Sequence, residues 1–280
     1  MKEVLVVANR TIGGIRLLEA VRERAAGGDV HFRLVVPQTK PSAGLVIYDE
    51  AVRESAQVRV DLALSAVAAE GIEATGEVGD PDPFMATMDA VAVHRPDEII
   101  LSTYPAQHSG WLRRDLIERI HNASGLPVHH IVADVDQEGL SFKVTLVVAN
   151  KTSSGEELIA RLSEKAAEGD QRLFIAIVPQ AEKSGNGPRE ARARLATMLD
   201  HLDTAGLLSS GMIGDPDPYT ATMNALELFH VDDVVISTLP GERSGWLRSH
   251  LIERVRSATS VPVEHVVVDA QANSVAAPAA

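Results

Sequence analysis

The chain has 280 residues, 45% hydrophobic and 23% charged, a soluble globular composition long enough for one large domain or two ordinary ones. Its formal net charge of −13 repels the phosphates of nucleic acids and of anionic membranes, so neither is an expected partner. The absence of cysteine excludes disulfides and thiolate chemistry, and with no apolar run suited to a signal peptide or to the roughly 20 residues of a membrane span, a cytoplasmic protein is expected.

Short β-branched runs alternate with helical patterns along the first half of the chain. The strand-like runs cover residues 4–8, 31–36, 72–78, 98–101 and 128–132, and the helical patterns cover residues 15–26, 50–70, 83–94 and 110–123. Apolar strands separated by helices predict a parallel sheet that is covered on both faces. Because crossovers are right-handed, the predicted fold is α/β, a doubly wound, Rossmann-like sheet of five strands.

The second half of the chain repeats the first. VLVVANRTIGG, which starts at Val4, returns as TLVVANKTSSG from Thr145, and STYPAQHSGWLRRDLIERI from Ser102 returns as STLPGERSGWLRSHLIERV from Ser237. A period of about half the chain indicates two duplicated domains and not a solenoid. The expected layout is two tandem domains at residues 1–134 and 143–270, a linker at 135–142 and a C-terminal tail at 271–280.

Small polar residues follow the first and fourth strands of each half. In a doubly wound sheet a ligand sits beyond the carboxyl ends of the strands, where the strand order reverses, so these residues can present hydroxyl and amide groups to it. The candidate binding residues are Asn9, Thr11, Ser102 and Thr103 in the first half and Asn150, Thr152, Ser237 and Thr238 in the second. The alternative is that Asn9 and Thr11 only satisfy a turn and cap the next helix.

The segment Ser-Gly-Trp-Leu-Arg predicts an anion site in each half. Ser109 is expected to be the N-cap of a helix, Gly110 permits close approach of the backbone, and Arg113 falls in the first turn, where the helix dipole disfavours a cation. An anion at the helix N-terminus would remove this conflict, because the free amides and the guanidinium would both face it. The alternative is an arginine whose stem packs on the core while its head reaches solvent. The equivalent candidates in the second half are Ser244, Gly245 and Arg248.

The Gly-Asp-Pro-Asp-Pro segment from Gly79, repeated from Gly214, is typical of a helix start. Asp80 can cap the helix, proline suits its first position, and Asp82 complements the positive end of the dipole. A metal-binding Asp-x-Asp interpretation lacks further ligands in the sequence, so we expect capping and no metal requirement.

The remaining histidines and tryptophans predict no catalytic centre. His130 and His265 are equivalent, lie on the expected last strands and could sit at a contact between the two halves. His108 corresponds to Arg243, so a catalytic role common to both halves is not expected. The two tryptophans, at equivalent places, are expected to be core or interface anchors and not platforms for a stacked base.

The segment VGDPDPFMATMDAVAVHRPDEIILST resembles the part of universal stress proteins in which Gly-Asp-Pro opens the helix before the fourth strand. The opening strand, the closing helix and the last strand follow in the same order in both halves. The resemblance implies a tandem member of the adenine nucleotide α-hydrolase-like superfamily, with its halves packed as a pseudo-two-fold pair and a homodimer possible. It also implies ATP, AMP or a smaller anion such as phosphate as ligand, in a stress response and without dedicated catalysis.

Two departures from the family pattern bear on the ligand. ATP-binding members carry G-x2-G-x9-G-[S/T] after the fourth strand, whereas here a shorter loop with one glycine follows Thr103, and Asn9 and Asn150 replace the usual aspartate. A nucleotide held differently and a smaller anion fit these residues equally well. Two other functions stay open, namely an interaction scaffold using the apolar stretch Leu45–Tyr48, and a nucleotide hydrolase of the same superfamily using the region of Ser102 and Thr103.

Overall fold

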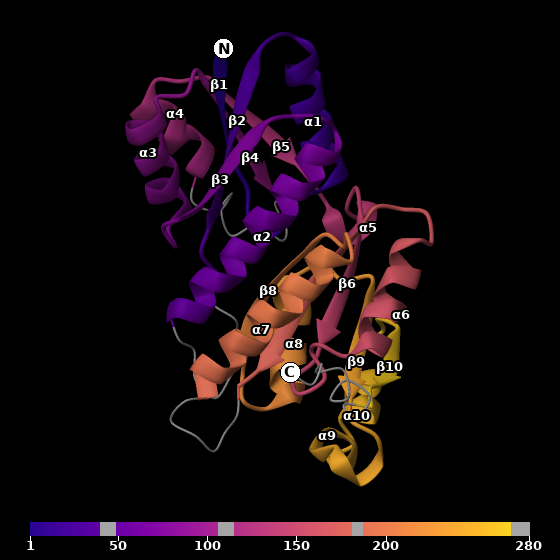
Figure 1. Ribbon diagram of the computed structural model, residues 1–280. Coiled ribbons are helices and arrows are strands. Elements are labelled where there is room, and N and C mark those ends of the chain that lie inside the picture. Colours follow the sequence, from indigo (N-terminus) through magenta and orange to yellow (C-terminus); the bar gives the residue numbers. More distant parts are fainter. Residues whose placement is uncertain (40–48, 106–114, 181–186, 270–280) are drawn as a thin grey trace, which may run out of the picture. The chain divides into compact units, whose positions relative to one another are not determined.

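The computed structural model describes residues 1–39, 49–105, 115–180 and 187–269 (Figure 1). The chain divides into two compact units, and Phe142 ends the first while Lys143 begins the long continuous segment of the second. Among the described residues, no helix has both the length and the apolar character needed to cross a membrane. The apolar stretch Leu45–Tyr48 and the expected tail at 271–280 lie outside the described residues.

The first unit is a parallel sheet with the strand order β3-β2-β1-β4-β5. Its strands are β1 (Lys2–Val7), β2 (Val30–Pro37), β3 (Ala74–Gly79), β4 (Glu98–Thr103) and β5 (Val128–Val132). The helices described in this unit are α1 (Ile15–Ala26), α2 (Asp49–Ala69), α3 (Pro83–His94), α4 (Leu116–Ser124) and α5 (Val135–Glu138).

Alternate residues of β1 pack into two separate cores. Val4 and Val6 pack in one cluster with side chains of α1 and α2. Leu5 and Val7 pack in another with side chains of α3 and α4. Successive side chains of a strand point to opposite faces, so helices cover both faces of the sheet, and each buried aliphatic side chain stabilises the unit by about 1.5–3 kcal/mol.

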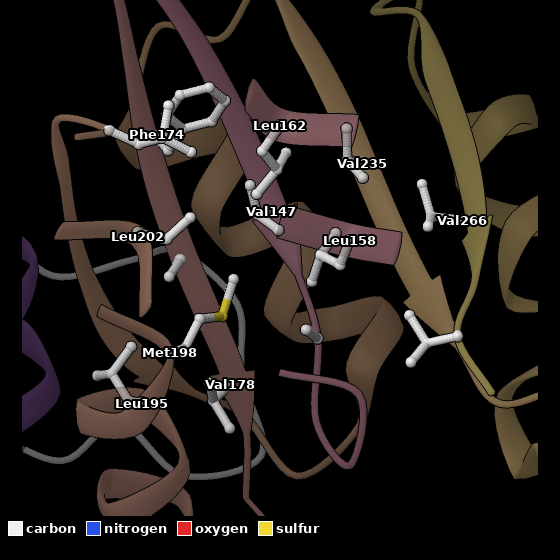
Figure 2. Close-up of a cluster of buried hydrophobic side chains, with 14 of the residues drawn as sticks. Val147, Leu158, Leu162, Phe174, Val178, Leu195, Met198, Leu202, Val235 and Val266 are labelled. Atoms are coloured by element: carbon white, nitrogen blue, oxygen red, sulfur yellow. The ribbon is translucent and has the colours of Figure 1, made fainter. Parts of the chain in front are cut away.

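The second unit repeats this architecture with the strand order β10-β9-β6-β7-β8. Its strands are β6 (Lys143–Val148), β7 (Arg172–Pro179), β8 (Ser209–Gly214), β9 (Asp233–Thr238) and β10 (Val263–Val267). Its described helices are α6 (Glu156–Ala166), α7 (Gly187–Thr204), α8 (Pro218–Leu228), α9 (Gly245–Arg248) and α10 (Leu251–Ala258). Figure 2 shows Val147 of β6 and Phe174 of β7 in one core with Leu158 of α6 and residues of α7. The prediction of two tandem, doubly wound, five-stranded domains is therefore confirmed, and their pairing stays a prediction.

One predicted helix is wrong in its extent. The sequence predicts a continuous helix over residues 110–123 and over the equivalent segment of the second half. In the second unit the chain forms the four-residue α9 and then the separate α10, because His250 between them has a left-handed φ of 53°. Asp115, which precedes α4 in the first unit, has a φ of 48°. A right-handed helix does not continue through a left-handed residue, so the helix predicted for the second half is divided at His250, and in the first unit α4 begins only after Asp115.

The segment 135–142, expected to be a linker, belongs to the first unit. Four of its residues form α5, and Val135 and Phe142 are buried. The backbone N–H of Ser141 donates to the carbonyl of Gly13 at 3.2 Å. Gly13 has a φ of 82°, and a Cβ there would lie 2.8 Å from the ring of Phe142, so this packing requires glycine.

Candidate functional site

The strand order reverses between β1 and β4 in the first sheet and between β6 and β9 in the second. The connections that leave two such strands cross to opposite faces and open a crevice at the carboxyl ends. In the second unit this crevice is a pocket of about 320 Å³. It is lined by Asn150, Lys151, Thr152, Ser237, Thr238, Leu239, Arg243, Ser244, Gly245 and Trp246.

Six of the residues predicted from the sequence line this pocket, and four lining residues were missed. The missed residues are Lys151, Leu239, Arg243 and Trp246. Trp246 is half-buried on the pocket wall and is therefore not a core residue, while its expected role at an interface stays a prediction. The signal for Lys151 was its place directly after Asn150 in the reversal loop, but a lysine there also suits an exposed turn.

Two buried polar atoms of pocket-lining residues have no hydrogen-bond partner in the described part of the chain. They are Oγ of Ser237, a residue only 1% exposed, and Oδ1 of Asn150, whose Nδ2 donates to the carbonyl of Pro179 at 3.4 Å. The first unit repeats both features in Oγ of Ser102 and Oδ1 of Asn9. A buried polar group without a partner costs about 1–3 kcal/mol, so few persist in native proteins.

Threonine hydroxyls fix the loops after the first strand of each unit. Oγ1 of Thr152 donates to the carbonyl of Ser237 at 3.2 Å, and Oγ1 of Thr11 donates to the carbonyl of Ser102 at 3.3 Å. The N-caps of α1 and α6 are glycines without side-chain hydrogen bonds. The alternative that these polar residues cap the next helix is therefore wrong. Each threonine ties the loop after the first strand to the end of the fourth strand.

A threonine–histidine pair lies beside each of these loops. Oγ1 of Thr238 is 2.8 Å from Nε2 of His265, and Oγ1 of Thr103 is 2.9 Å from Nε2 of His130. Burial lowers the pKa of both imidazoles, which keeps them neutral at pH 7. Each hydroxyl also lies 3.0 or 2.9 Å from the carbonyl of the next residue. With one proton available, the threonine donates to that carbonyl and accepts from the Nε2–H tautomer of the histidine.

Ser244 is the N-cap of α9, as predicted, and its Oγ accepts from the N–H of Leu247 at 3.3 Å. Helix α9 has four residues, so Arg248 ends a single turn and does not lie in the first turn of a long helix. A single turn sums few peptide dipoles, which weakens the reason for placing an anion there. The side chain of Arg248 and the loop 106–114 lie outside the described residues. The predicted roles of Ser109, Gly110, Arg113 and Arg248 therefore stay predictions.

Capping aspartates open helices α3 and α8. Oδ1 of Asp82 accepts from the N–H of Phe84 at 2.8 Å, and Oδ2 of Asp217 accepts from the N–H of Thr220 at 3.1 Å. Asp80, predicted as the cap, instead accepts from the N–H of Asp82 at 2.8 Å and closes the preceding turn. In the described ranges, no group of three or more His, Cys, Asp or Glu residues could hold a metal ion.

The pocket of the second unit combines two cations with the unpartnered polar atoms. Lys151 is exposed and makes no hydrogen bond, ion pair or ring contact with any described residue. Arg243 donates to Asp269 at 3.1 Å, and both side chains are about half exposed. A ligand here can meet positive charge and the ring of Trp246, while Oγ of Ser237 and Oδ1 of Asn150 are buried in the pocket wall.

Comparison with known proteins gives matches among solved structures, whereas no family model and no curated protein matches the sequence. A universal stress protein from Archaeoglobus fulgidus is 15% identical, and the match covers 96% of this chain and 97% of that chain with a TM-score of 0.35. A universal stress family protein from Arabidopsis thaliana with AMP bound is 16% identical over 49% of this chain and 95% of that chain, with a TM-score of 0.35. A universal stress protein in complex with cAMP is 15% identical over 48% and 98%, with a TM-score of 0.33. The chain is thus similar to structures of the family that its sequence motifs resemble.

Proposed function

We propose that the protein binds a small phosphate-bearing molecule, such as AMP or ATP, in the pocket between the ends of β6 and β9. It acts as a regulatory ligand-binding protein of the universal stress type and not as a dedicated catalyst. The observation that carries this proposal is the pair of unpartnered polar atoms, Oγ of Ser237 and Oδ1 of Asn150, which Ser102 and Asn9 repeat. Both atoms are buried, so a ligand reaches them only when the two side chains turn towards the pocket; by accepting from the serine and donating to the asparagine it then satisfies both and recovers their desolvation cost.

The surroundings of these atoms indicate the chemistry of the ligand. Lys151 and Arg243 supply positive charge for a phosphate, despite the net charge of −13 of the whole chain. The ring of Trp246 offers an apolar face to a base or sugar. A volume of about 320 Å³ is at the small end of ligand pockets, which favours AMP over ATP.

Titration calorimetry with AMP, ATP and inorganic phosphate tests the proposal. We expect saturable binding of AMP to the wild-type protein and a loss of about tenfold or more in affinity for Ser237→Ala and for Lys151→Ala, because each removes a hydrogen bond or charge that faces the phosphate. Lys143→Ala is the matched control, since Lys143 begins β6 at the opposite end of the same strand. Absence of saturable binding by all three compounds would contradict the proposal and favour the interaction scaffold.

The threonine–histidine pairs favour a second candidate, a nucleotide hydrolase. Thr238 lines the pocket and contacts a neutral imidazole, which is the relation of a nucleophile to its base. The hydroxyl proton, however, is directed to the carbonyl of Leu239, so the geometry favours a structural role for the pair. ATP turnover by the wild-type protein that Thr238→Val abolishes would establish the hydrolase instead.

A further inference from the structure

We propose that Asp269 sets the charge selectivity of the pocket in the second unit, so that a monophosphate is preferred to a polyphosphate. The Asp269 carboxylate competes with the ligand for Arg243 and repels ligands that carry more negative charge. This inference rests on the proposed function and adds which phosphate-bearing molecules the pocket takes.

An ion pair already engages one of the cations that line the pocket. Nη2 of Arg243 donates to Oδ1 of Asp269 at 3.1 Å, and the two side chains are 45% and 55% exposed. Arg243 is a lining residue, whereas Asp269 lies two residues after the end of β10 and outside the lining. A phosphate that binds Arg243 must therefore displace the carboxylate or lie next to it.

The backbone of Asp269 is fixed close to the pocket. The N–H of the preceding residue, Val268, donates to the carbonyl of Thr238 at 2.9 Å, and Thr238 lines the pocket. Val268 is only 1% exposed, and the N–H of Asp269 itself donates to Oε1 of Glu157 at 3.3 Å. A displaced Asp269 side chain can rotate away from Arg243, but its charge stays near any phosphate bound there, and Glu157 adds a second carboxylate.

The strength of the ion pair decides which ligands compete with it. A pair of half-exposed side chains contributes little to stability, so a phosphate with about two negative charges displaces the single charge of the carboxylate easily. Repulsion between the ligand and the displaced carboxylate, by contrast, grows with the charge of the ligand. Asp269 therefore hinders a monophosphate slightly and a polyphosphate more strongly.

The lining residues offer positive charge for one phosphate. Lys151 and Arg243 are cations, and the described residues of the lining include no other Lys or Arg and no Asp or Glu. These two cations balance a monophosphate, which carries about two negative charges at pH 7. Each additional phosphate has no further cation in the described lining and is repelled by Asp269, and such opposition of like charges creates selectivity.

Titration calorimetry of the full chain with AMP, ATP and adenosine, without divalent cations, tests this inference. Binding in the second unit is identified as the binding that Lys151→Ala weakens, and we expect it to be tighter for AMP than for ATP. Asp269→Asn keeps the size of the side chain and removes its charge. It should raise the affinity for AMP about two- to fivefold and the affinity for ATP about tenfold or more. Adenosine, which carries no charge, should respond alike to both proteins.

Asp170→Asn is the matched control. Asp170 is exposed and precedes β7 at the amino-terminal end of the same sheet, so its substitution removes one charge at the opposite end of the strands from the pocket. We expect it to leave the ratio of the AMP and ATP affinities unchanged. Higher ionic strength should reduce the effect of Asp269→Asn, because exposed charges are screened.

Three results would overturn the inference, and they are distinguishable from one another. An unchanged ratio of the AMP and ATP affinities in Asp269→Asn would refute the role of Asp269 and leave the proposed function standing. An equal gain in affinity for adenosine would show that Asp269 acts through the shape of the pocket and not through its charge. Absence of saturable binding by the wild-type protein would remove the proposed function together with the inference.

Discussion

Ser237 and Thr152 line the same pocket, but of their two hydroxyls only that of Thr152 has a hydrogen-bond partner among the described residues. Oγ1 of Thr152 donates to a strand carbonyl, whereas Oγ of Ser237 is buried without a partner among the described residues. A satisfied hydroxyl stabilises the folded state by about 1 kcal/mol, and an unsatisfied buried one costs about 1–3 kcal/mol. The Thr152 hydroxyl thus stabilises the fold, and the Ser237 hydroxyl is the one that the proposed function assigns to the ligand.

We therefore predict opposite effects of removing the two hydroxyls in the ligand-free protein. Ser237→Ala should raise the free energy of unfolding by about 1 kcal/mol, and Thr152→Val should lower it by about 1 kcal/mol. Urea unfolding followed by circular dichroism measures both. Equal destabilisation by the two variants would mean that Ser237 has a partner in the free protein, and would contradict its assignment to the ligand.

Gly155 is the N-cap of α6, and the strand-end residue Val268 packs directly against it. A Cβ at Gly155 would lie 2.2 Å from Cγ1 of Val268, while a Cβ at the equivalent Gly14 would meet its nearest atoms at 3.0 Å. We expect Gly155→Ala to destabilise the second unit by about 1–3 kcal/mol through overpacking, and Gly14→Ala to cost less. The unfolding midpoints of the two variants check this order, and a reversed order would contradict the packing described.

At the scale of elements, the start of α3 depends on one carboxylate. Asp82 accepts from the N–H of Phe84, so Asp82→Ala should destabilise the protein by about 0.5–2 kcal/mol. Asp89, exposed in the middle of the same helix, provides the matched control, and Asp89→Ala should have little effect. Thermal unfolding of the two variants distinguishes a cap from a general effect of charge.

Ion pairs around Glu98, at the start of β4, stabilise the amino-terminal end of the first unit's sheet. Its carboxylate lies 2.9–3.3 Å from nitrogens of Lys2, Arg24 and His129. Burial acts to raise the pKa of Glu98, but the hydrogen bond from Lys2 and the neighbouring positive charges outweigh it, so the pKa is lowered. The ionised carboxylate therefore stabilises the folded state above the unfolded pKa of about 4.3.

This stabilisation should be lost as the pH falls from about 4.3 through the lowered pKa of the folded protein. Glu98→Gln should flatten that part of the dependence of stability on pH and lower stability at pH 7. Glu23→Gln, at an exposed position of α1, is the control. An unchanged acid limb in Glu98→Gln would show that other carboxylates carry the acid sensitivity.

Most elements of the fold could be predicted because the local signals agree with the tertiary structure. The bounds of α1 and α3 are those predicted, since apolar periodicity and a Pro-Asp-Pro start define them. The break at His250 could not be predicted, because neither glycine nor proline marks it. The choice of Asp82 over Asp80 as the cap likewise depends on the path of the preceding turn.

The position of the candidate site in the sheet could be predicted from the sequence, but which of its polar atoms have hydrogen-bond partners could not. The reversal of strand order places Asn150 and Ser237 together, and both follow from the sequence repeat. Whether their polar atoms have partners depends on neighbours from distant segments, such as the carbonyl of Pro179. Trp246, which lies in α9, was likewise not predicted on the pocket wall.

At the scale of the whole molecule, the two units share their strand order, but several residues around their candidate sites differ. Each unit has its own sheet, its own cores and an unpartnered Asn–Ser pair at the reversal point. The charged and aromatic residues around those pairs have diverged, from Arg10 and Tyr104 to Lys151 and Leu239. The polar pair is thus the same in both units, while the residues beside it differ.

A crystal structure of the full chain with saturating AMP tests the central claim most directly. We predict AMP in the pocket at the ends of β6 and β9, with a ligand acceptor about 3 Å from Oγ of Ser237 and a ligand donor about 3 Å from Oδ1 of Asn150. AMP bound elsewhere on the chain, or a pocket in which both atoms are satisfied by the protein itself, would contradict it.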